Sequence, residues 1–406
     1  MAENNPDSPA TIRKVASSRT VRHINRAAIL ELIRESEPIS RSGIADILSL
    51  SLPTVMRIVD ELIEDDLVLD TGASQSTGGR PRTLLSFNGS SHAVIGVDLG
   101  SRSMYGCLSD LSGEILHDRT IPHKETPEEN LSALMALIEE LIALPRPRKQ
   151  RLRGIGIAVP GIINMPEGIV DHAPSLSWEN LPLQEILTDQ FDLPIFVEND
   201  INLAALGEWG YGAGRSAHSL VTISIGTGLG GGVILDGTLL RGFNQAAGEI
   251  GFMFPGKEFL GKRYADWGAL ESRASGSAIA ARAEERLIEK NGKKPDKPLT
   301  AADVFTALRE GEDWAQEIVE ETADMLSIAI GNIIALLDPE LIVLGGGVAQ
   351  SSDILLPMIK TRLKGATPYM PRIIASELGK EASIKGAIML VLSGTTRYMI
   401  VKRVQQ

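Results

Sequence analysis

Cysteine is nearly absent from this 406-residue sequence. The single Cys107 excludes an intramolecular disulfide framework and any zinc or iron–sulfur site that is built on several cysteines. Long hydrophobic runs are also missing, because the longest strongly apolar stretch, residues 325–337, is shorter than the ~20 residues that a membrane-spanning helix needs. Positive charge is not in excess: 40 Lys and Arg against 52 Asp and Glu give a net charge of −12, so any nucleic-acid contact has to come from a local patch.

The rest of the composition is that of an ordinary globular protein, with 43% hydrophobic and 23% charged residues. At roughly 150 residues per domain, the length predicts two or three domains. The first residues are polar and acidic, the opposite of a secretory signal. We therefore expect a soluble, cytoplasmic, multidomain protein without a membrane partner.

Three short helices and a hairpin are predicted near the N-terminus. Apolar residues at helical spacing predict an amphipathic helix over residues 21–35. Ser40 is placed to cap a second, short helix, and Ser51 to cap a third helix whose first turn contains Pro53. Two short strands then flank a turn-rich tip at residues 71–82. This order of elements is that of a winged helix-turn-helix.

The third of these helices is the candidate for the major groove of DNA, because its N-terminal residues lie off its apolar face. A guanidinium there can reach a guanine or a phosphate, and hydroxyl groups can bond to phosphate or base. The wing tip adds arginines among glycines with no acidic neighbour, which suits a minor-groove or phosphate contact. The predicted DNA-binding residues are Ser51, Pro53, Thr54 and Arg57 on the helix and Arg80 and Arg82 on the wing.

Charge leaves a second interpretation open, because small three-helix units also serve as protein-docking modules. Residues 1–90 contain 10 Lys and Arg and 12 Asp and Glu, which does not by itself favour DNA. The distribution is uneven, however, and this favours DNA: acids gather at the far end of the third helix, away from a basic run upstream. The basic run comprises Arg13, Lys14, Arg19, Arg22, Arg26 and Arg34, and the acidic group Glu61, Glu64, Asp65 and Asp66.

From about residue 90, apolar strands alternate with helical segments, which is typical of an α/β domain. Strands near residues 94, 154, 220 and 341 each run into a glycine turn, and such turns can offer backbone amides to phosphates. The first and third read strand, glycine turn, strand. This internal similarity predicts a duplicated domain with a cleft between its halves.

A polar pair follows another apolar strand of this domain. Asn199 and Asp200 lie between that strand and an alanine-rich helix. An aspartate there can take a proton from a sugar hydroxyl or hydrogen-bond to it, whereas the structural alternative for Asp200 is a helix N-cap. Each glycine turn alone is weak evidence, but together with this pair the turns indicate a site for sugar and phosphate.

At this point the sequence resembles a known family, the ROK family, named for repressors, open reading frames and sugar kinases. The resemblance extends over residues 20–395, and residues 75–83 are similar to the wing of the family's repressor branch. It implies an α/β fold in which a winged helix-turn-helix precedes a duplicated, actin-like sugar-kinase domain with the sugar between its two lobes. The kinases of the family lack the N-terminal module. We expect a flexible arm at 1–20, a winged helix-turn-helix at 21–88 and the two-lobed domain at 89–396.

The resemblance also implies roles for single residues. Asn199 and Asp200 match the sugar-binding pair, and Asp200 stands in the position of the kinases' catalytic base. Glu249 and Glu271 match further ligands of sugar hydroxyls, although either carboxylate can instead cap a helix or pair with a cation. The residues that match the family's ATP site are Asp98, Gly226, Thr227 and Gly228.

Two departures from the family pattern bear on cofactors. The family follows Gly-Glu-Ile-Gly with a histidine and a cysteine-rich zinc loop, but here Phe252 follows, and neither Cys nor His occurs after His218. In the first phosphate turn, Ser101 and Arg102 replace a glycine and a threonine, which should impair ATP binding. We therefore expect no zinc and no resident cofactor. The residues expected to hold the former zinc loop by apolar packing are Phe252, Phe254, Phe259 and Trp267.

These features together favour a sugar-responsive transcriptional repressor. A homodimer or homotetramer would bind an inverted-repeat operator, and a sugar or sugar phosphate in the cleft would release it. The second interpretation is an ATP-dependent sugar kinase that carries a DNA-binding arm, in which Asp200 is the base and residues 226–232 hold phosphates. The third is a docking protein whose N-terminal unit binds protein.

Overall fold

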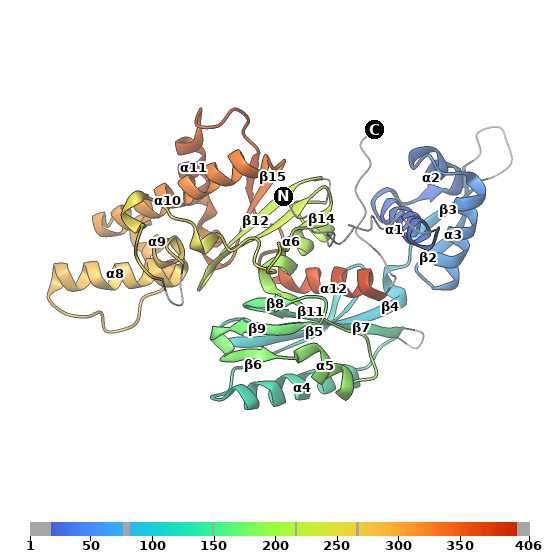
Figure 1. Cartoon of the computed structure of the whole chain (residues 1–406), viewed down its shortest axis with the longest axis horizontal. Coiled ribbons are helices and arrows are strands. Elements are labelled where there is room, and N and C mark those ends of the chain that lie inside the picture. Colours follow the sequence, from blue (N-terminus) through green and yellow to red (C-terminus); the bar gives the residue numbers. More distant parts are fainter. Residues whose placement is uncertain (1–17, 76–81, 148–149, 216, 265–267, 396–406) are drawn as a thin grey trace, which may run out of the picture. The chain divides into compact units, whose positions relative to one another are not determined.

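A computed structural model of the chain describes residues 18–75, 82–147, 150–215, 217–264 and 268–395 (Figure 1). Contacts between residues divide the chain into two compact units, of which the first ends at Phe87 and the second runs from Asn88 to Thr395. Within the described ranges, no helix is both long and apolar enough to cross a membrane.

The first unit contains three helices and a small sheet. Its elements are α1 (Ser18–Ser36), β1 (Ile39–Ser40), α2 (Arg41–Ile47), α3 (Leu52–Glu64), β2 (Val68–Gln75) and β3 (Arg82–Phe87). As predicted, Ser40 caps α2 by accepting a hydrogen bond from the Gly43 amide, and Ser51 caps α3 by accepting one from the Thr54 amide. α1 begins slightly earlier than predicted. The sheet order is β1-β3-β2, which makes the hairpin the wing.

Apolar spacing makes α3 part of the core of this unit. Val55, Ile58, Val59 and Leu62 are all fully buried, and their spacing puts them on one face of the helix. Burying each such side chain contributes roughly 1.5–3 kcal/mol. The opposite face of α3 is left to solvent. β1, which pairs with β3, was not predicted, because a two-residue strand shows no alternation of apolar residues.

Two five-stranded sheets form the second unit. The first consists of β4 (His92–Asp98), β5 (Ser103–Asp110), β6 (Ile115–Pro122), β7 (Arg151–Val159) and β11 (Ile195–Asn199). The second consists of β12 (Leu220–Ile225), β13 (Leu229–Leu235), β14 (Thr238–Leu239), β15 (Leu341–Gly345) and β16 (Arg372–Ala375). Their orders are β11-β7-β4-β5-β6 and β14-β13-β12-β15-β16.

The two sheets share one topology, so the predicted duplication is present in the strand order. In the first sheet β4 pairs antiparallel with β5 and parallel with β7, and in the second β12 pairs antiparallel with β13 and parallel with β15. The outer pairs correspond as well: β5–β6 and β13–β14 are antiparallel, and β7–β11 and β15–β16 are parallel. The predicted glycine turns connect β4 to β5 and β12 to β13.

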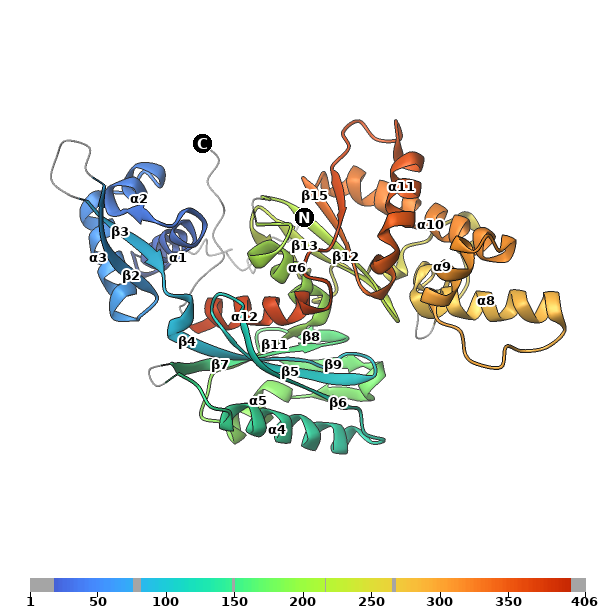
Figure 2. The ribbon, with the colours of Figure 1, turned by 180° about the vertical axis from the view of Figure 1, so that it is seen from behind.

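Helices cover both sheets and bury a separate hydrophobic core on each. Figure 2 shows α4 (Pro127–Ala143) and α5 (Leu183–Gln190) on one face of the first sheet and α12 (Ala382–Thr395) on the other. A small sheet of β8 (Ile162–Asn164), β9 (Ile169–Ala173) and β10 (Trp178–Leu181) completes this first lobe. The other helices are α6 (Asp200–Tyr211), α7 (Glu271–Ala274), α8 (Gly276–Asn291), α9 (Ala301–Arg309), α10 (Asp313–Leu337) and α11 (Ser352–Leu363).

The two lobes meet along α6 and α12. α6 follows the last strand of the first sheet but packs on β12 and β13 of the second, and α12 follows the last strand of the second sheet but packs on β4 and β7 of the first. The helices cross very closely: a Cβ at Gly207 would overlap the carbonyl oxygen of Ala382, and one at Gly386 would overlap that of Leu203. Only glycine permits this approach of two backbones.

We expect Gly386→Ala to destabilise the second unit, because the added methyl group meets backbone atoms that cannot rotate away. Overpacking of a core costs about 1–3 kcal/mol, which lowers the Tm of a unit of this size by several degrees. Gly347→Ala is the matched control, because a Cβ there meets nothing within 4 Å and should leave the Tm unchanged. Equal Tm values for the two variants in thermal unfolding would contradict the close crossing.

Candidate functional site

The N-terminal turn of α3 is open to solvent, as a DNA-contacting surface has to be. Ser51, Pro53 and Arg57 are exposed, and Thr54 is half-buried. The hydroxyls of Ser51 and Thr54 lie 2.8 Å apart, so both already take part in the helix cap. Among the described residues, Arg57 has no acidic partner, which leaves its guanidinium available to a guanine or a phosphate.

Two apolar residues beside Arg57 were missed by sequence reasoning. Leu52 is 44% exposed and Met56 is 47% exposed. Both lie off the buried face of α3, and apolar side chains in this position can contact the methyl group of thymine. The sequence could have indicated them, because Leu52 and Met56 are apolar residues that do not fit the helical spacing of the buried residues of α3.

Two arginines of the predicted basic run pair with acids at the C-terminal end of α3, whereas Arg13 and Lys14 of that run lie outside the described residues. Arg22 Nη2 lies 2.5 Å from Glu61 Oε1, and Arg26 Nη2 lies 2.5 Å from Asp65 Oδ2. The acidic far end of α3 therefore neutralises arginines that the sequence suggested as part of a basic patch. The effect on stability is small because these pairs reach solvent, but the effect on local charge is direct.

The wing is described in part. Arg80 lies outside the described residues, and Arg82 is the first residue of β3. Arg41, to which sequence reasoning gave no role, forms two ion pairs. Its Nη2 lies 3.3 Å from Oδ1 of Asp60 in α3, and its Nη1 lies 3.4 Å from Oδ2 of Asp70 in β2. It thereby ties the candidate recognition helix to the sheet that carries the wing.

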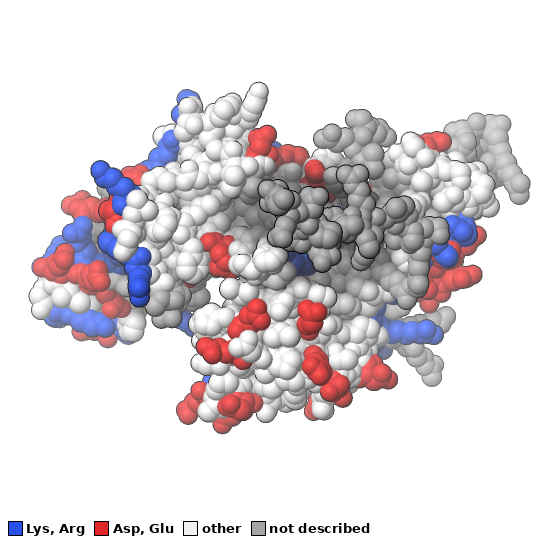
Figure 3. All heavy atoms as spheres, in the orientation of Figure 1, with Lys and Arg blue, Asp and Glu red and all other residues white. Residues whose placement is uncertain are grey.

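The surface of the second unit carries an acidic face. Figure 3 shows mainly acidic side chains over the lobe that contains α4 and α5. Such a face repels phosphates rather than attracting them. Exposed acidic residues of this lobe include Glu128, Glu139, Glu167, Glu179, Glu185 and Asp189.

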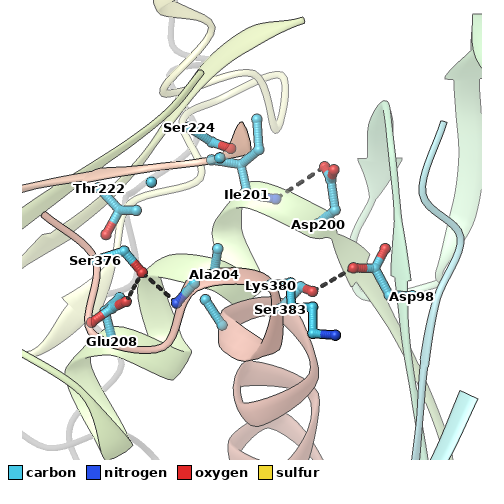
Figure 4. A pocket seen from close by; sticks show the side chains of 14 residues that line it. Asp98, Asp200, Ile201, Ala204, Glu208, Thr222, Ser224, Ser376, Lys380 and Ser383 are labelled. Carbon is cyan, nitrogen blue, oxygen red and sulfur yellow. Dashed lines mark hydrogen bonds between the residues drawn. The ribbon is translucent and has the colours of Figure 1, made fainter. Parts of the chain in front are cut away.

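Asn199 and Asp200 lie where β11 ends and α6 begins. Asn199 is the helix cap: its Oδ1 accepts hydrogen bonds from the amides of Ile201 at 3.0 Å and Asn202 at 2.9 Å. Its Nδ2 donates to the Gly161 carbonyl oxygen at 2.8 Å. The alternative that Asp200 is the N-cap is therefore wrong. The Asp200 carboxylate lines a cavity instead, and so does that of Asp98 (Figure 4).

This cavity has a volume of about 200 Å³ and lies at the N-terminal ends of α6 and α12. Ser383, in the first turn of α12, donates a hydrogen bond from Oγ to Asp98 Oδ2 at 2.5 Å. The remaining polar side chains of the lining are Thr222 and Ser224 of β12, Glu208 of α6, and Ser376 and Lys380 of the segment before α12.

Glu208 is a buried carboxylate that sequence reasoning missed. It is fully buried and accepts hydrogen bonds from the amides of Ala213 at 3.1 Å and Leu378 at 3.2 Å, and from the Ser376 hydroxyl. Glu208 thus ties the C-terminal end of α6 to the segment that leads into α12. Two of its donors, Ser376 and Leu378, are distant in sequence, so no local pattern could have found them.

Four carboxylates influence one another around the cavity. Burial, with the charges of Asp98 and Glu249 as further causes, raises the pKa of Asp200 to about 8. Burial also raises the pKa of Asp98, against the hydrogen bond from Ser383. Surrounding protein atoms raise the pKa of Glu249, whose side chain still reaches solvent, and that of Glu271, where the charge of Glu249 adds to the effect. Asp98 and Asp200 therefore line the cavity itself, whereas Glu249 and Glu271 are linked to them by charge without lining it.

Glu271 connects α7 with the second glycine turn. Its carboxylate accepts hydrogen bonds from the amides of Leu229 and Gly268. A Cβ at Gly228 would lie 2.6 Å from its Oε1, so glycine at this position lets the turn of residues 226–228 pass close to the carboxylate. Within the described part of the chain, neither Glu271 nor Glu249 caps a helix through its side chain or has a cationic partner.

Comparison with known proteins identifies the family. Residues 94–393 match the ROK family, and residues 22–68 match a winged helix-turn-helix DNA-binding family. The chain belongs to the ROK family.

Its ROK relatives include both regulators and enzymes. A xylose repressor of Caldicellulosiruptor bescii is 31% identical over 387 residues, which are 92% of this chain and 96% of the repressor. A glucokinase of Halalkalibacterium halodurans is 34% identical over 319 residues, which are 73% of this chain and 94% of the glucokinase. Among solved structures, a ROK family transcriptional regulator, a homologue of the Escherichia coli MLC protein, matches with a TM-score of 0.79 and 28% identity, covering 93% of this chain and 98% of that one.

The zinc site that the ROK resemblance implies does not fit the residues of this ROK chain. No cysteine or histidine follows His218, and no group of His, Cys, Asp or Glu in the described ranges is arranged to hold a metal ion. The expectation that aromatic packing replaces the zinc is right for Phe259, which is buried. It is wrong for Phe252 and Phe254, each of which is 52% exposed. Trp267 lies outside the described residues.

The first glycine turn of this ROK chain differs from a phosphate-binding turn at Ser101 and Arg102, and both are exposed. His123 Nε2 lies 2.5 Å from the Gly100 carbonyl oxygen and holds the turn in place. The adjoining cavity has the carboxylates of Asp98, Asp200 and Glu208 in its lining, with Lys380 as a cation.

Asp200 makes the stability of the second unit depend on pH. Its pKa is raised from 3.8 to about 8, so it contributes stability that is complete below pH 4 and is lost as the pH rises through 8. We expect Asp200→Asn to stabilise the unit relative to the wild type above pH 8, by on the order of a few kcal/mol, and to have little effect at pH 4. Tm values from pH 4 to pH 9 measure this difference. A difference in Tm between Asp200→Asn and the wild type that is the same at every pH would contradict the prediction.

Proposed function

We propose that the protein is a transcriptional repressor whose first unit binds operator DNA and which is released when a sugar or sugar phosphate binds to its second unit. The observation that carries the proposal is the combination, in one chain, of a helix that presents Arg57 to solvent and a carboxylate-lined ROK site. The share of the chain that each relative covers supports the proposal, because the xylose repressor aligns with 92% of this chain and the glucokinase with 73%.

On operator DNA, α3 lies in the major groove. Arg57 hydrogen-bonds to a guanine or a phosphate, and Ser51, Pro53 and Thr54 lie against the backbone beside it. Arg80 and Arg82 on the wing contact a phosphate or the minor groove. A homodimer or homotetramer would present two such helices to an inverted repeat with half-sites about one helical turn apart.

The effector is a molecule rich in hydroxyl groups. Asp200, Glu249 and Glu271 accept hydrogen bonds from its hydroxyls, and Asn199 fixes the turn of α6 that carries Asp200. Because the pKa of Asp200 is about 8, a large part of this group is protonated at neutral pH and can also donate a hydrogen bond.

Sugar and operator oppose each other through linkage. A sugar that lowers the operator affinity by a given factor is itself bound more weakly by that factor when operator is present. Shifting the protein from about 99% to about 1% of the DNA-competent state requires a roughly 10⁴-fold difference in sugar affinity between the two states.

A sugar kinase is the second candidate, favoured by the identity to the glucokinase and by Asp200 in the position of the base. A pKa of about 8 leaves part of Asp200 ionised at neutral pH, as a general base needs. ATP-dependent phosphorylation of a sugar that is lost in Asp200→Asn would establish this activity. Absence of turnover with xylose, glucose and N-acetylglucosamine would count against it.

We expect Arg57→Ala to weaken operator binding by about 1–3 kcal/mol, because it removes a cation from the predicted DNA surface that no acidic residue of the described chain neutralises. Fluorescence anisotropy with DNA from upstream of the protein's own gene measures the change. Titration of the wild-type complex with sugars and sugar phosphates then names the effector.

Arg22→Ala is the matched control, because it removes an arginine of the same unit that is already paired with Glu61. Its operator affinity should differ from wild type by less than about twofold. Equal losses in the two variants would contradict a special role for Arg57. If the wild type binds no upstream DNA even at low salt, the repressor proposal fails and protein docking by the first unit takes its place.

A further inference from the structure

We propose that the ion pair between Glu198 and Arg241 positions the two halves of the effector site, and that Arg241 is a positioning residue for sugar binding. The inference rests on the proposed sugar-binding function and deepens it. Neither residue is one of the predicted sugar ligands. Glu198 directly precedes Asn199 and Asp200, and the loop that begins at Arg241 ends directly before Glu249.

Glu198 is held in place by three donors. It is 1% exposed and stands directly before Asn199 and Asp200 at the end of β11. Its Oε1 accepts hydrogen bonds from the Asn199 amide at 3.0 Å and from Asn202 Nδ2 at 3.1 Å. Its Oε2 accepts one from Arg241 Nε at 2.7 Å. Arg241 is the one charged partner among these three donors, and removing the cation from a buried ion pair leaves an uncompensated buried charge.

Arg241 belongs to the other lobe, where it follows β14 and opens the loop of residues 241–248. Two hydrogen bonds fix this loop. The Ala247 amide donates to the Arg241 carbonyl oxygen at 2.9 Å, and the amide of Gly231 in β13 donates to the Gly248 carbonyl oxygen at 2.7 Å. Gly248 has a φ of +92°, and a Cβ there would overlap the Gly231 carbonyl oxygen. Glu249 is the next residue after Gly248. Arg241 is therefore connected to Glu249 by a short loop whose ends are fixed by hydrogen bonds.

The pair therefore joins the end of a strand in one lobe to a loop of the other lobe. On one side Glu198 precedes Asp200, and on the other Arg241 leads to Glu249. A sugar that contacts both carboxylates needs them at a fixed separation, and a misplacement of about 1 Å can cost a factor of 10². Loss of the pair frees the loop from the strand end and weakens sugar binding without touching a ligand residue.

The test uses the full chain and isothermal titration with D-xylose, D-glucose, N-acetyl-D-glucosamine and the 6-phosphates of the last two. In Arg241→Met, the Kd of each sugar that binds the wild type should rise about 10- to 100-fold. Operator affinity without sugar should stay within about twofold of wild type, because the first unit is unchanged. Arg241→Lys keeps a cation for Glu198 and should recover most of the sugar affinity.

Arg119→Met is the matched control for these titrations. It removes an arginine of the same unit from a 2.6 Å pair with Glu140, in which both side chains are 49% exposed. This variant should bind sugar as the wild type does. A loss of sugar affinity equal to that of Arg241→Met would overturn the proposal, because it would show a general effect of removing a cation.

Hydrogen–deuterium exchange gives a readout that does not depend on the sugar. In Arg241→Met, the amides of residues 241–249 and 199–203 should exchange at least about tenfold faster, and those of α10 should be unchanged. A general loss of stability would speed α10 as well. If burial of an unpaired Glu198 keeps this variant from folding, Glu198→Gln with Arg241→Met removes both charges and should show the same local change.

The outcomes separate the two proposals. Wild-type sugar affinity and unchanged local exchange in Arg241→Met would overturn the positioning role. If no sugar of the panel binds the wild type, the proposed sugar function fails, and the exchange experiment still decides whether the pair holds the loop to the strand end.

Discussion

The close crossing of α6 and α12 is the contact on which the arrangement of the second unit depends. Gly207 and Gly386 let each helix reach the backbone of the other, and the first turns of these helices carry Asp200 and Ser383. Ser383 in turn holds Asp98. Because a helix is rigid over one or two turns, fixing the crossing point also fixes where Asp98 and Asp200 lie relative to each other. The geometry of the site is therefore set by small residues that touch no ligand.

A cluster of carboxylates at this place is unfavourable unless something compensates its charge. Protonation of one carboxyl group removes part of the charge, and the raised pKa of Asp200 means that this group holds its proton up to a higher pH. A ligand with several hydroxyl donors is another, because it satisfies carboxylate oxygens without adding negative charge. Nucleotide phosphates would add charge of the same sign beside Asp98 and Asp200. The charges of Asp98 and Asp200 do not by themselves separate a sugar site from a kinase site, because the resemblance gives both positions to the family's kinases. The difference lies in the first glycine turn, where Ser101 and Arg102 are exposed.

Sequence alone predicted the parts of the structure that rest on local signals. Ser40 and Ser51 reveal helix starts because a cap needs a side-chain oxygen at one position, and repeated glycine turns reveal the duplication. The site depended on family resemblance, since nothing local brings Asp200, Glu249 and Glu271 together from three separate segments. The structural alternative placed the helix cap at Asp200, whereas Asn199 is the cap, because both residue types suit that position. Arg241, the cationic partner of Glu198, and Leu378, a donor to Glu208, lie tens of residues or more from these carboxylates in the sequence. The exposure of Phe252 and Phe254 depends on tertiary packing.

Charge also constrains how the first unit can hold DNA. Beyond residue 90 the chain has 30 basic and 40 acidic residues, so the second unit repels phosphates overall. Within the first unit Arg22, Arg26 and Arg41 are paired with acids, whereas Arg57 has no acidic partner among the described residues. Each phosphate that such an arginine neutralises makes binding to DNA weaker at higher salt. Two copies joined on one operator bind the second half-site at a high effective concentration, and weak half-site affinities then multiply. We therefore favour an oligomer on two half-sites. Such an assembly is also easily released, because a sugar that spoils the fit of one half-site removes most of the affinity.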